Sequence, residues 1–184
     1  MFGTGLEAVL YLVLIGVTLL GVLSIVYRSW RNGISPMPSS APVRRAVAEE
    51  VNRLSRTGTL IEAGSGWGTL ALDLARRCQG WTIIGLENSW LPLWVSRALA
   101  CLSKKQSAVS FQRADLYEYA YEQAAVVVCY LYPGAMKRLS RIFDVKLAPG
   151  TVILSVCFAL PEWEPERIIT CGDVYHTKIY VYTA

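Results

Sequence analysis

Charged residues are scarce in this chain. They make up 17% of its 184 residues, whereas hydrophobic residues make up 53%. A typical soluble domain carries about 25% charged residues. This balance excludes an intrinsically disordered chain, a collagen and a coiled coil. The length allows one globular domain together with an additional segment.

Histidine and paired cysteines are scarce as well. His176 is the single histidine, and the five cysteines form no Cys-x-x-Cys pair. Zinc sites are built from clusters of these residues, so we expect no metal site. An odd number of cysteines without such a pair is typical of reduced thiols in a reducing compartment.

Charge of either sign is missing from one long stretch, Ala8–Tyr27, in which 16 of 20 residues are apolar. A helix of this length spans about 30 Å, the thickness of a bilayer core. A buried core helix is the alternative, but this stretch is apolar on every face. No signal-peptide cleavage site follows it. We therefore predict a transmembrane anchor over residues 6–27.

The charges on the two sides of this anchor predict its orientation. Glu7 precedes the apolar stretch, whereas four arginines follow it before residue 46. The positive-inside rule then places the rest of a single-pass membrane protein on the cytoplasmic side. Residues 28–184 carry 18 basic and 13 acidic side chains, a net charge of +5. This excess is too small to predict nucleic-acid binding, and we expect no nucleic-acid partner.

The remaining chain divides into a linker and one domain. Prolines and serines in residues 28–42 predict a semi-rigid juxtamembrane linker. In residues 43–184, apolar runs alternate with helical patterns, which predicts an α/β domain with a parallel sheet and helices on both faces. The expected strands are Thr59–Ala63, Trp81–Glu87, Ala108–Ala114, Ala124–Leu131, Thr151–Leu160 and an antiparallel Tyr175–Thr183. One expected helix begins near Ala41. The other expected helices cover Thr69–Cys78, Leu91–Leu102 and Ala135–Leu147, and a short helix is expected after Ala114.

A glycine motif stands between the first strand and its helix. The run Glu62-Ala63-Gly64-Ser65-Gly66-Trp67-Gly68 has the spacing E-x-G-x-G-x-G. A dinucleotide fingerprint would place its third glycine one residue later. Glycines let the backbone approach a ligand closely. Because the carboxylate suits a ligand that carries an ammonium and a sulfonium, the motif favours S-adenosylmethionine.

Two further acids follow the next two strands. Glu87 ends the second strand, and Asp115 follows the third. The carboxyl ends of parallel strands meet at one edge of the sheet, where open α/β sheets bind their ligands. We expect Glu87 to accept hydrogen bonds from the ribose hydroxyls and Asp115 to accept one from the adenine amino group.

The fourth strand leads into the aromatic loop Tyr130-Leu131-Tyr132-Pro133. This loop is not Asn-Pro-Pro-Tyr, so methylation of adenine or of a glutamine amide loses support. Tyrosine rings attract a cation, and a phenol can bond an amine. We therefore expect an amine as methyl acceptor, with core packing as the alternative role for one of the two tyrosines.

Together these motifs resemble the class I, seven-strand S-adenosylmethionine-dependent methyltransferases. More narrowly, the chain is similar to the small membrane-anchored protein-lysine methyltransferases, some of which modify the ATP synthase c subunit or the adenine nucleotide translocase. The narrower resemblance is carried by Pro36–Ser40, Gly85–Leu91, Asp115-Leu116 and the F-x-x-P-x-W-x-P segment Phe158–Pro165. The chain departs from the usual family pattern at Glu62, Trp67 and Thr69, where Asp, Asp and Arg are common.

The resemblance implies S-adenosylmethionine as cofactor and a lysine of a membrane-associated protein as acceptor. It implies an acceptor pocket formed by Tyr130, Tyr132 and Trp163. The implied cofactor-binding residues are Pro38, Ser39, Glu62, Gly64, Ser65, Gly66, Gly68, Glu87, Asn88, Asp115 and Leu116.

Two alternatives stay open from the sequence. A membrane-anchored enzyme could methylate a lipid, a quinone or another small molecule, and a deep apolar acceptor pocket would favour that reading. A non-catalytic methyltransferase-like module would have lost the acids at the strand ends. Those acids are present, which favours an enzyme.

Overall fold

The structure is a computed structural model that describes residues 3–32, 38–103 and 107–184. The chain forms two compact units, Met1–Ser35 and Pro36–Ala184. The predicted linker over residues 28–42 spans their boundary, and its residues 33–37 lie outside the described part.

The first unit is the helix α1 (Gly3–Asn32). Large apolar side chains along it are more than half exposed, among them Val9 at 56%, Leu12 at 69% and Leu20 at 69%. Within the described residues, no helix meets the combined length and apolarity needed to cross a membrane. The anchor over residues 6–27 therefore stays a prediction.

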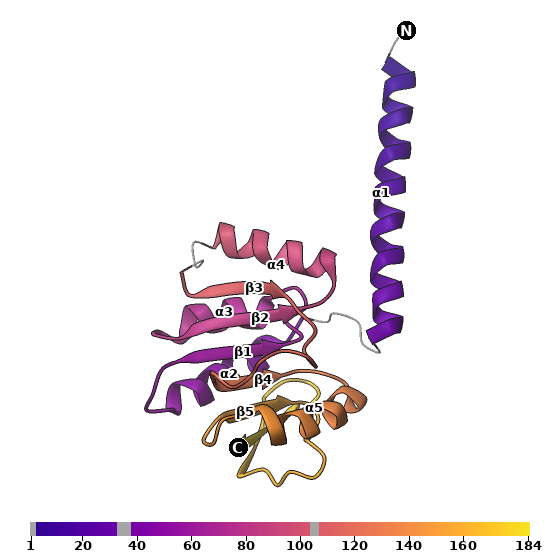
Figure 1. Ribbon diagram of the computed structural model, residues 1–184. Helices are drawn as coiled ribbons and strands as arrows, with labels where there is room; N and C mark the ends of the chain where they lie inside the picture. Colours follow the sequence, from indigo (N-terminus) through magenta and orange to yellow (C-terminus); the bar gives the residue numbers. More distant parts are fainter. Residues whose placement is uncertain (1–2, 33–37, 104–106) are drawn as a thin grey trace. The chain divides into compact units, whose positions relative to one another are not determined.

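The second unit is built on a seven-stranded sheet in the order β3-β2-β1-β4-β5-β7-β6 (Figure 1). The pairs among β1 to β5 are parallel, whereas β7 runs antiparallel to both of its neighbours. The strands are β1 (Thr59–Ala63), β2 (Thr82–Glu87), β3 (Val109–Arg113), β4 (Ala124–Cys129), β5 (Val152–Val156), β6 (Arg167–Thr170) and β7 (Lys178–Thr183).

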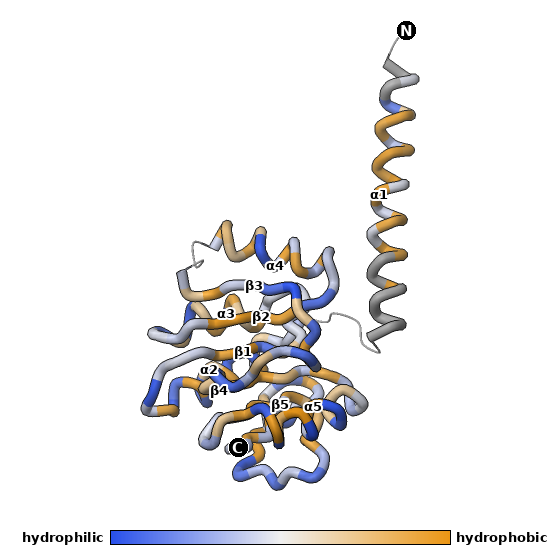
Figure 2. The backbone as a smooth tube through the Cα atoms, in the orientation of Figure 1, coloured by the Kyte–Doolittle hydropathy of each residue, from blue (hydrophilic) through white to orange (hydrophobic). Residues whose placement is uncertain are grey.

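Helices cover both faces of this sheet. On one face, α2 (Ala41–Arg53), α3 (Thr69–Arg77) and α4 (Trp90–Leu102) share an apolar cluster with the strands. On the other face, α5 (Pro133–Lys146) packs in a second cluster. Figure 2 shows the hydrophobic strands between these layers and the more hydrophilic connections around them. The central strand β4 is apolar along its length because both of its faces are covered.

The predicted α/β class, its mostly parallel sheet and its antiparallel final strand are confirmed. Strand β6 was not predicted, because its four residues are largely exposed and carry no alternating apolar pattern. The predicted strand Thr151–Leu160 is too long. The strand ends at Val156, since Cys157 adopts a left-handed φ of 75° that turns the chain.

The short helix predicted after Ala114 is wrong. The described connection from β3 to β4 holds only turns, and these cover the same sheet face as α5. The amides of Glu118 and Tyr119 both donate to the Asp115 carbonyl at 3.1 Å, and side chains bind other backbone groups of the connection. Asp115 accepts the Tyr117 amide at 2.9 Å, and the Tyr121 hydroxyl donates to the Leu116 carbonyl at 2.6 Å. The Lys146 ammonium donates to two further carbonyls of this connection.

Candidate active site

The predicted cofactor residues gather at the carboxyl edge of β1, β2 and β3, which are neighbours in the sheet. Crossover geometry explains this, because every parallel strand ends at the same edge and is followed there by a loop. The site is therefore built from three successive loops, one after each strand.

The loop after β1 is a tight glycine turn. Gly64, Gly66 and Gly68 have φ values of 80°, 51° and 76°, a left-handed region that favours glycine. A Cβ at Gly64 would lie 2.7 Å from Leu131 Cδ2, and one at Gly68 would lie 2.5 Å from Phe111 Cζ. The turn thus needs glycine both for its backbone and for its close contacts.

Ser65 is buried in the middle of this turn. Its amide donates to the Leu86 carbonyl at 2.8 Å, which ties the turn to β2. Its hydroxyl has no hydrogen-bond partner among the described residues. A buried hydroxyl without a partner is costly, so this oxygen is available to a polar ligand.

Glu87 connects the first two loops. One of its carboxylate oxygens accepts the Gly66 amide at 3.0 Å, and the other accepts the Ser89 amide at 2.7 Å. Each oxygen keeps a lone pair for a further donor. Asn88 beside it is half-buried. The contact of Glu87 with the ribose hydroxyls stays a prediction.

Glu62 lies deeper than its predicted role suggests. It is 5% exposed, and its carboxylate accepts the Ala71 amide of α3 at 3.0 Å. Burial raises the pKa of this carboxyl to about 8; the Ala71 hydrogen bond acts against that rise, and the nearby Glu87 adds to it. A cationic ligand above the turn would favour its ionised form.

Asp115 and Leu116 form the third loop. Asp115 is exposed and open to a ligand at the edge. Leu116 is half-buried, and its Cδ2 would lie 3.8 Å from a Cβ at Gly64. The structure therefore brings this third loop next to the glycine turn.

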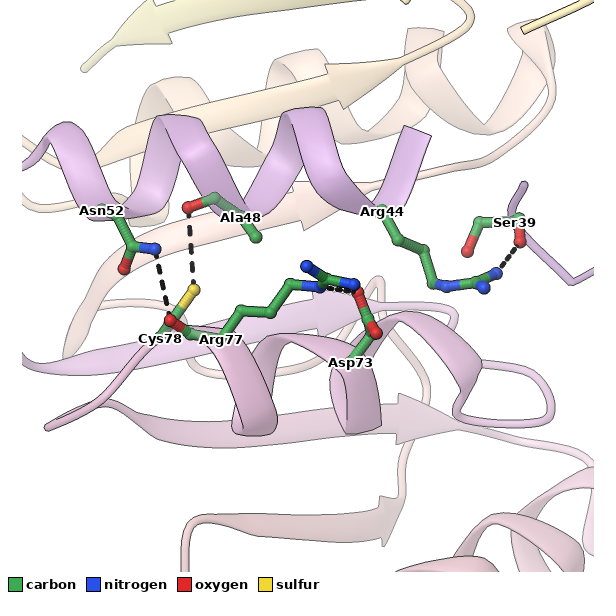
Figure 3. Close-up of polar contacts among 7 residues, drawn as sticks. All are labelled: Ser39, Arg44, Ala48, Asn52, Asp73, Arg77 and Cys78. Atoms are coloured by element: carbon green, nitrogen blue, oxygen red, sulfur yellow. Dashed lines mark hydrogen bonds and ion pairs between the residues drawn. The ribbon is translucent and has the colours of Figure 1, made fainter. Parts of the chain in front are cut away.

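The segment before α2 also reaches the domain. Pro38 is exposed, Ser39 is 5% exposed, and the Ser39 hydroxyl has no partner among the described residues. Arg44 donates to the Ser39 carbonyl, as Figure 3 shows. The Ser40 hydroxyl caps α2 and also reaches Asp173 at 3.5 Å.

The α2–α3 contact behind this segment is polar as well. The Asn52 amide donates to the Arg77 carbonyl at 3.2 Å, and Arg77 pairs with Asp73 at 2.6 Å (Figure 3). The Asn52 hydrogen bond ties α2 to the helix that follows the glycine turn, whereas the Arg77–Asp73 pair lies within that helix. They leave the Ser39 hydroxyl without a partner in this layer.

The predicted acceptor residues divide between the two faces of the sheet. Tyr132 and Trp163 pack with the α5 cluster, whereas Tyr130 packs with the opposite cluster. The Tyr117 hydroxyl is hydrogen-bonded to Tyr132; burial first, and then this contact, raise the pKa of Tyr117 to about 12. Tyr132 and Trp163 therefore lie on the same face of the sheet, and Tyr130 lies on the other; the acceptor pocket formed by all three stays a prediction.

Trp163 is placed by aromatic packing. Its ring lies edge-on to Tyr182, with centroids 6.1 Å apart, and Tyr182 accepts the Leu160 amide at 2.9 Å. The indole Nε1 is buried with no partner among the described residues. Tyrosine and tryptophan usually find a partner when they are buried, so this donor is available to a ligand.

Sequence reasoning missed several residues that support the site. Phe111 of β3 fills the space beneath Gly68 and Gly85. Asp173 holds the Ser40 cap and accepts both the amide and the hydroxyl of Thr177, and these hydrogen bonds lower its pKa. In the sequence, only the turn pattern Gly172-Asp173 marks this position. That pattern does not indicate a contact with Ser40, which lies 133 residues earlier.

The comparisons with known proteins agree with this geometry. Residues 62–167 match the model of the ANTKMT methyltransferase domain. The chain belongs to this family. The match includes the glycine turn, Glu87, Asp115 and the F-x-x-P-x-W-x-P segment. The sequence prediction of a class I methyltransferase of this family is confirmed.

Three curated relatives resemble this ANTKMT-family chain. A lysine N-methyltransferase of Xenopus laevis, named for the c subunit of ATP synthase, is 29% identical over 119 residues, which are 64% of this chain and 51% of the relative. The adenine nucleotide translocase lysine N-methyltransferase of Mus musculus is 27% identical over 143 residues, which are 74% of this chain and 62% of the relative. A protein-lysine N-methyltransferase of Saccharolobus islandicus is 25% identical over 151 residues, which are 80% of this chain and 90% of the relative. The chain thus spans only part of the two animal relatives.

A solved structure supports the fold of this ANTKMT-family member. The RNA methyltransferase of Salinibacter ruber, crystallised with S-adenosyl-L-homocysteine, is 28% identical and superposes with a TM-score of 0.72. The likeness covers 80% of this chain and 93% of that chain. The Rossmann-like methyltransferase architecture predicted from the sequence is confirmed.

Proposed function

We propose that this protein binds S-adenosylmethionine at the carboxyl edge of β1, β2 and β3 and transfers its methyl group to the side-chain amine of a protein lysine. The observation that carries the cofactor part is the glycine turn, which Glu87 holds in place through the Gly66 amide. The unpartnered hydroxyl of Ser65 fits a polar ligand there, and the unpartnered hydroxyl of Ser39 is a second candidate contact from the segment before α2. The three glycines of the turn carry no Cβ, so a ligand can approach the backbone closely.

Lysine is proposed as the acceptor on two grounds. The three curated relatives are all named lysine N-methyltransferases. In this chain, Tyr132 and Trp163 offer a hydroxyl and an unpartnered indole N–H on one side of the sheet. Aromatic rings attract an ammonium, and a phenol oxygen can accept a hydrogen bond from an amine.

The chain's own residues would act by binding and alignment. When it is bound, S-adenosylmethionine supplies a methyl group on a sulfonium, which is a good leaving group. Glu87 and Asp115 would hold the nucleoside, and Ser65 would hold a polar group beside the turn. Tyr132 would orient the acceptor amine through its hydroxyl. Because a lysine must lose its proton before it attacks, burial near the aromatic side chains would assist by lowering its pKa.

Membrane attachment is a further part of this proposal. The uncharged stretch Ala8–Tyr27 supports a single-pass anchor, and the arginines after it support a cytoplasmic domain. The exposure of the apolar side chains of α1 is consistent with a lipid environment. An anchored enzyme would meet lysines of neighbouring membrane proteins at high effective concentration.

The deciding experiment supplies the purified full chain with labelled S-adenosylmethionine and a membrane extract. Mass spectrometry should then find the label on a lysine side chain. Label on a lipid or a quinone would replace the lysine proposal with the small-molecule alternative. Label on RNA would favour the chemistry named for the Salinibacter ruber protein. Binding of S-adenosylmethionine with no labelled product in any fraction would favour a non-catalytic module.

A further inference from the structure

The outer side of α4 carries a row of exposed apolar residues. Trp90, Trp94, Ala98 and Leu102 are spaced four residues apart, so they lie along one side of the helix. Trp90 is 46% exposed, Trp94 is 62% exposed and Leu102 is 80% exposed. We call this row the α4 face. The rings of Trp90 and Trp94 meet edge-on, with centroids 6.1 Å apart.

The core does not need these side chains. Helix α4 is buried through a different set of residues, Pro92, Leu93, Ser96 and Ala100. The helix packs mainly on β3, at the edge of the sheet (Figure 1). Figure 2 shows hydrophobic and hydrophilic positions mixed along α4. Adjacent large apolar side chains that are left exposed mark an interaction surface.

We propose that the α4 face lies on an anionic lipid surface, an inference that rests on the membrane attachment proposed above. Charge identifies this occupant. Between Glu87 and Asp115 the described residues contain no acid and two exposed cations, Arg97 and Arg113. Tryptophan and basic residues are the side chains that favour the headgroup region of a bilayer, and basic residues are attracted by anionic lipids.

The position of Arg113 supports this assignment. Its guanidinium lies 4.0 Å from the centroid of the Trp90 ring, so a cation stands directly beside the aromatic end of the α4 face. The same positive charge opposes pairing of two copies through this face, because the symmetric contact would bring like charges together. An anionic surface satisfies both the apolar α4 face and the two arginines, Arg97 and Arg113, in and beside the helix.

Membrane contact through α4 would fix the orientation of the active site. As the crossover between parallel β2 and β3, α4 runs back along the sheet from its carboxyl edge. A helix that lies flat on the bilayer therefore keeps the strands along the surface, and the carboxyl edge opens sideways in the membrane plane. Trp90 follows Ser89, whose amide binds Glu87, so the contact begins beside the proposed cofactor site.

The test uses the full chain in anionic vesicles whose acyl chains carry bromine, which quenches nearby tryptophan fluorescence. A Trp30→Phe background removes the tryptophan closest in sequence to the proposed anchor. We expect brominated lipid to quench this background, and the added pair Trp90→Phe and Trp94→Phe to lose most of that quenching. As a matched control, Val145→Trp is added to the variant that lacks Trp30, Trp90 and Trp94. It places a reporter on α5, where Val145 is 84% exposed. This reporter should stay unquenched.

Equal quenching before and after removal of Trp90 and Trp94 would overturn the proposal, as would quenching of the reporter at position 145. Loss of self-association in the Trp90→Phe and Trp94→Phe variant, measured by sedimentation in detergent, would also overturn it and assign the α4 face to a second copy. Far-ultraviolet circular dichroism and cooperative urea unfolding check that each variant is folded.

The proposed function is tested separately on the same vesicles. Resistance to carbonate washing without quenching through α4 would leave the anchor standing and reject the α4 contact. Quenching through α4 in a chain that carbonate washing releases would support the α4 contact and reject the anchor. Methyl transfer to lysine is scored by the label and depends on neither result.

Discussion

Glu87 and Gly66 are joined across two loops, with the Gly66 amide donating to Oε2 of Glu87 at 3.0 Å. The other oxygen of this carboxylate accepts the Ser89 amide at 2.7 Å. One side chain at the end of β2 therefore holds both the glycine turn after β1 and the start of α4. This arrangement makes Glu87 important for the shape of the unliganded site as well as for binding.

Replacement of Glu87 should weaken S-adenosylmethionine binding. Glu87→Ala removes both backbone contacts and the proposed partner of the ribose hydroxyls, at a cost of roughly 1–3 kcal/mol, or about five- to 150-fold in Kd. Glu87→Gln keeps one acceptor oxygen and should lose less. Calorimetry measures both. Asp144→Ala, at an exposed acid near the far end of α5, is the matched control and should bind like the wild type. Unchanged affinity in Glu87→Ala would remove Glu87 from the site.

Gly64 should not tolerate a side chain. Gly64→Ala forces a residue with a Cβ into a φ of 80° and places that Cβ 2.7 Å from Leu131 Cδ2. The left-handed conformation alone costs about 1–2 kcal/mol. We expect a lower free energy of unfolding by urea and loss of cofactor binding. Gly172→Ala is the control, because a Cβ there meets nothing within 4 Å. Equal stability of the two variants would show that the turn adapts.

The fold was predictable where local pattern and burial agree. Strands β1 and β4 are apolar because both faces of the central sheet are covered, and that pattern is visible in the sequence. The connection after β3 was not predictable. Its conformation depends on Lys146, which lies 28 residues after Glu118 along the chain. The Lys146 ammonium donates to the Glu118 and Tyr119 carbonyls, which would accept backbone amides in a helix.

The site was predictable only in part, for a similar reason. Motif spacing places Glu87 and Asp115 at one edge, because all parallel strands end there. Spacing says nothing about depth, and Glu62 lies beneath α3 rather than open to the edge. Nor does it say that Tyr130 and Tyr132, two residues apart after β4, pack on opposite faces of the sheet.

Glu62 should make the stability of the unliganded protein depend on pH. Burial raises its folded-state pKa from 4.5 to about 8. Between these values the unfolded chain releases the Glu62 proton while the folded chain keeps it. The contribution of Glu62 to stability is therefore fully present below pH 4.5 and is lost as the pH rises toward 8. Urea denaturation from about pH 5 to about pH 8 should show this decline.

Glu62→Gln should flatten that decline, because the neutral amide still offers an oxygen to the Ala71 amide and does not titrate. The exposed Glu122→Gln provides the comparison and should follow the wild-type pH profile. A wild-type profile in Glu62→Gln would mean that other groups cause the pH dependence. A bound cation that favours ionised Glu62 should also make S-adenosylmethionine bind more tightly as the pH rises toward 8.

Methyl transfer to lysine should accelerate with pH and should depend on the Tyr132 hydroxyl. A free lysine has a pKa of about 10.4, so the neutral amine increases roughly ten-fold per pH unit between about pH 7 and pH 9. The initial rate at low acceptor concentration should follow that rise until cofactor binding or stability limits it.

Tyr132→Phe removes the hydroxyl that is hydrogen-bonded to Tyr117 and keeps the ring. If this hydroxyl orients the amine, kcat should fall while the Kd for S-adenosylmethionine is unchanged. Tyr130→Phe is the matched control from the opposite face of the sheet and should have a smaller effect. A larger loss in Tyr130→Phe would move the acceptor to that face, and a rate independent of pH would contradict an amine acceptor that must first lose a proton.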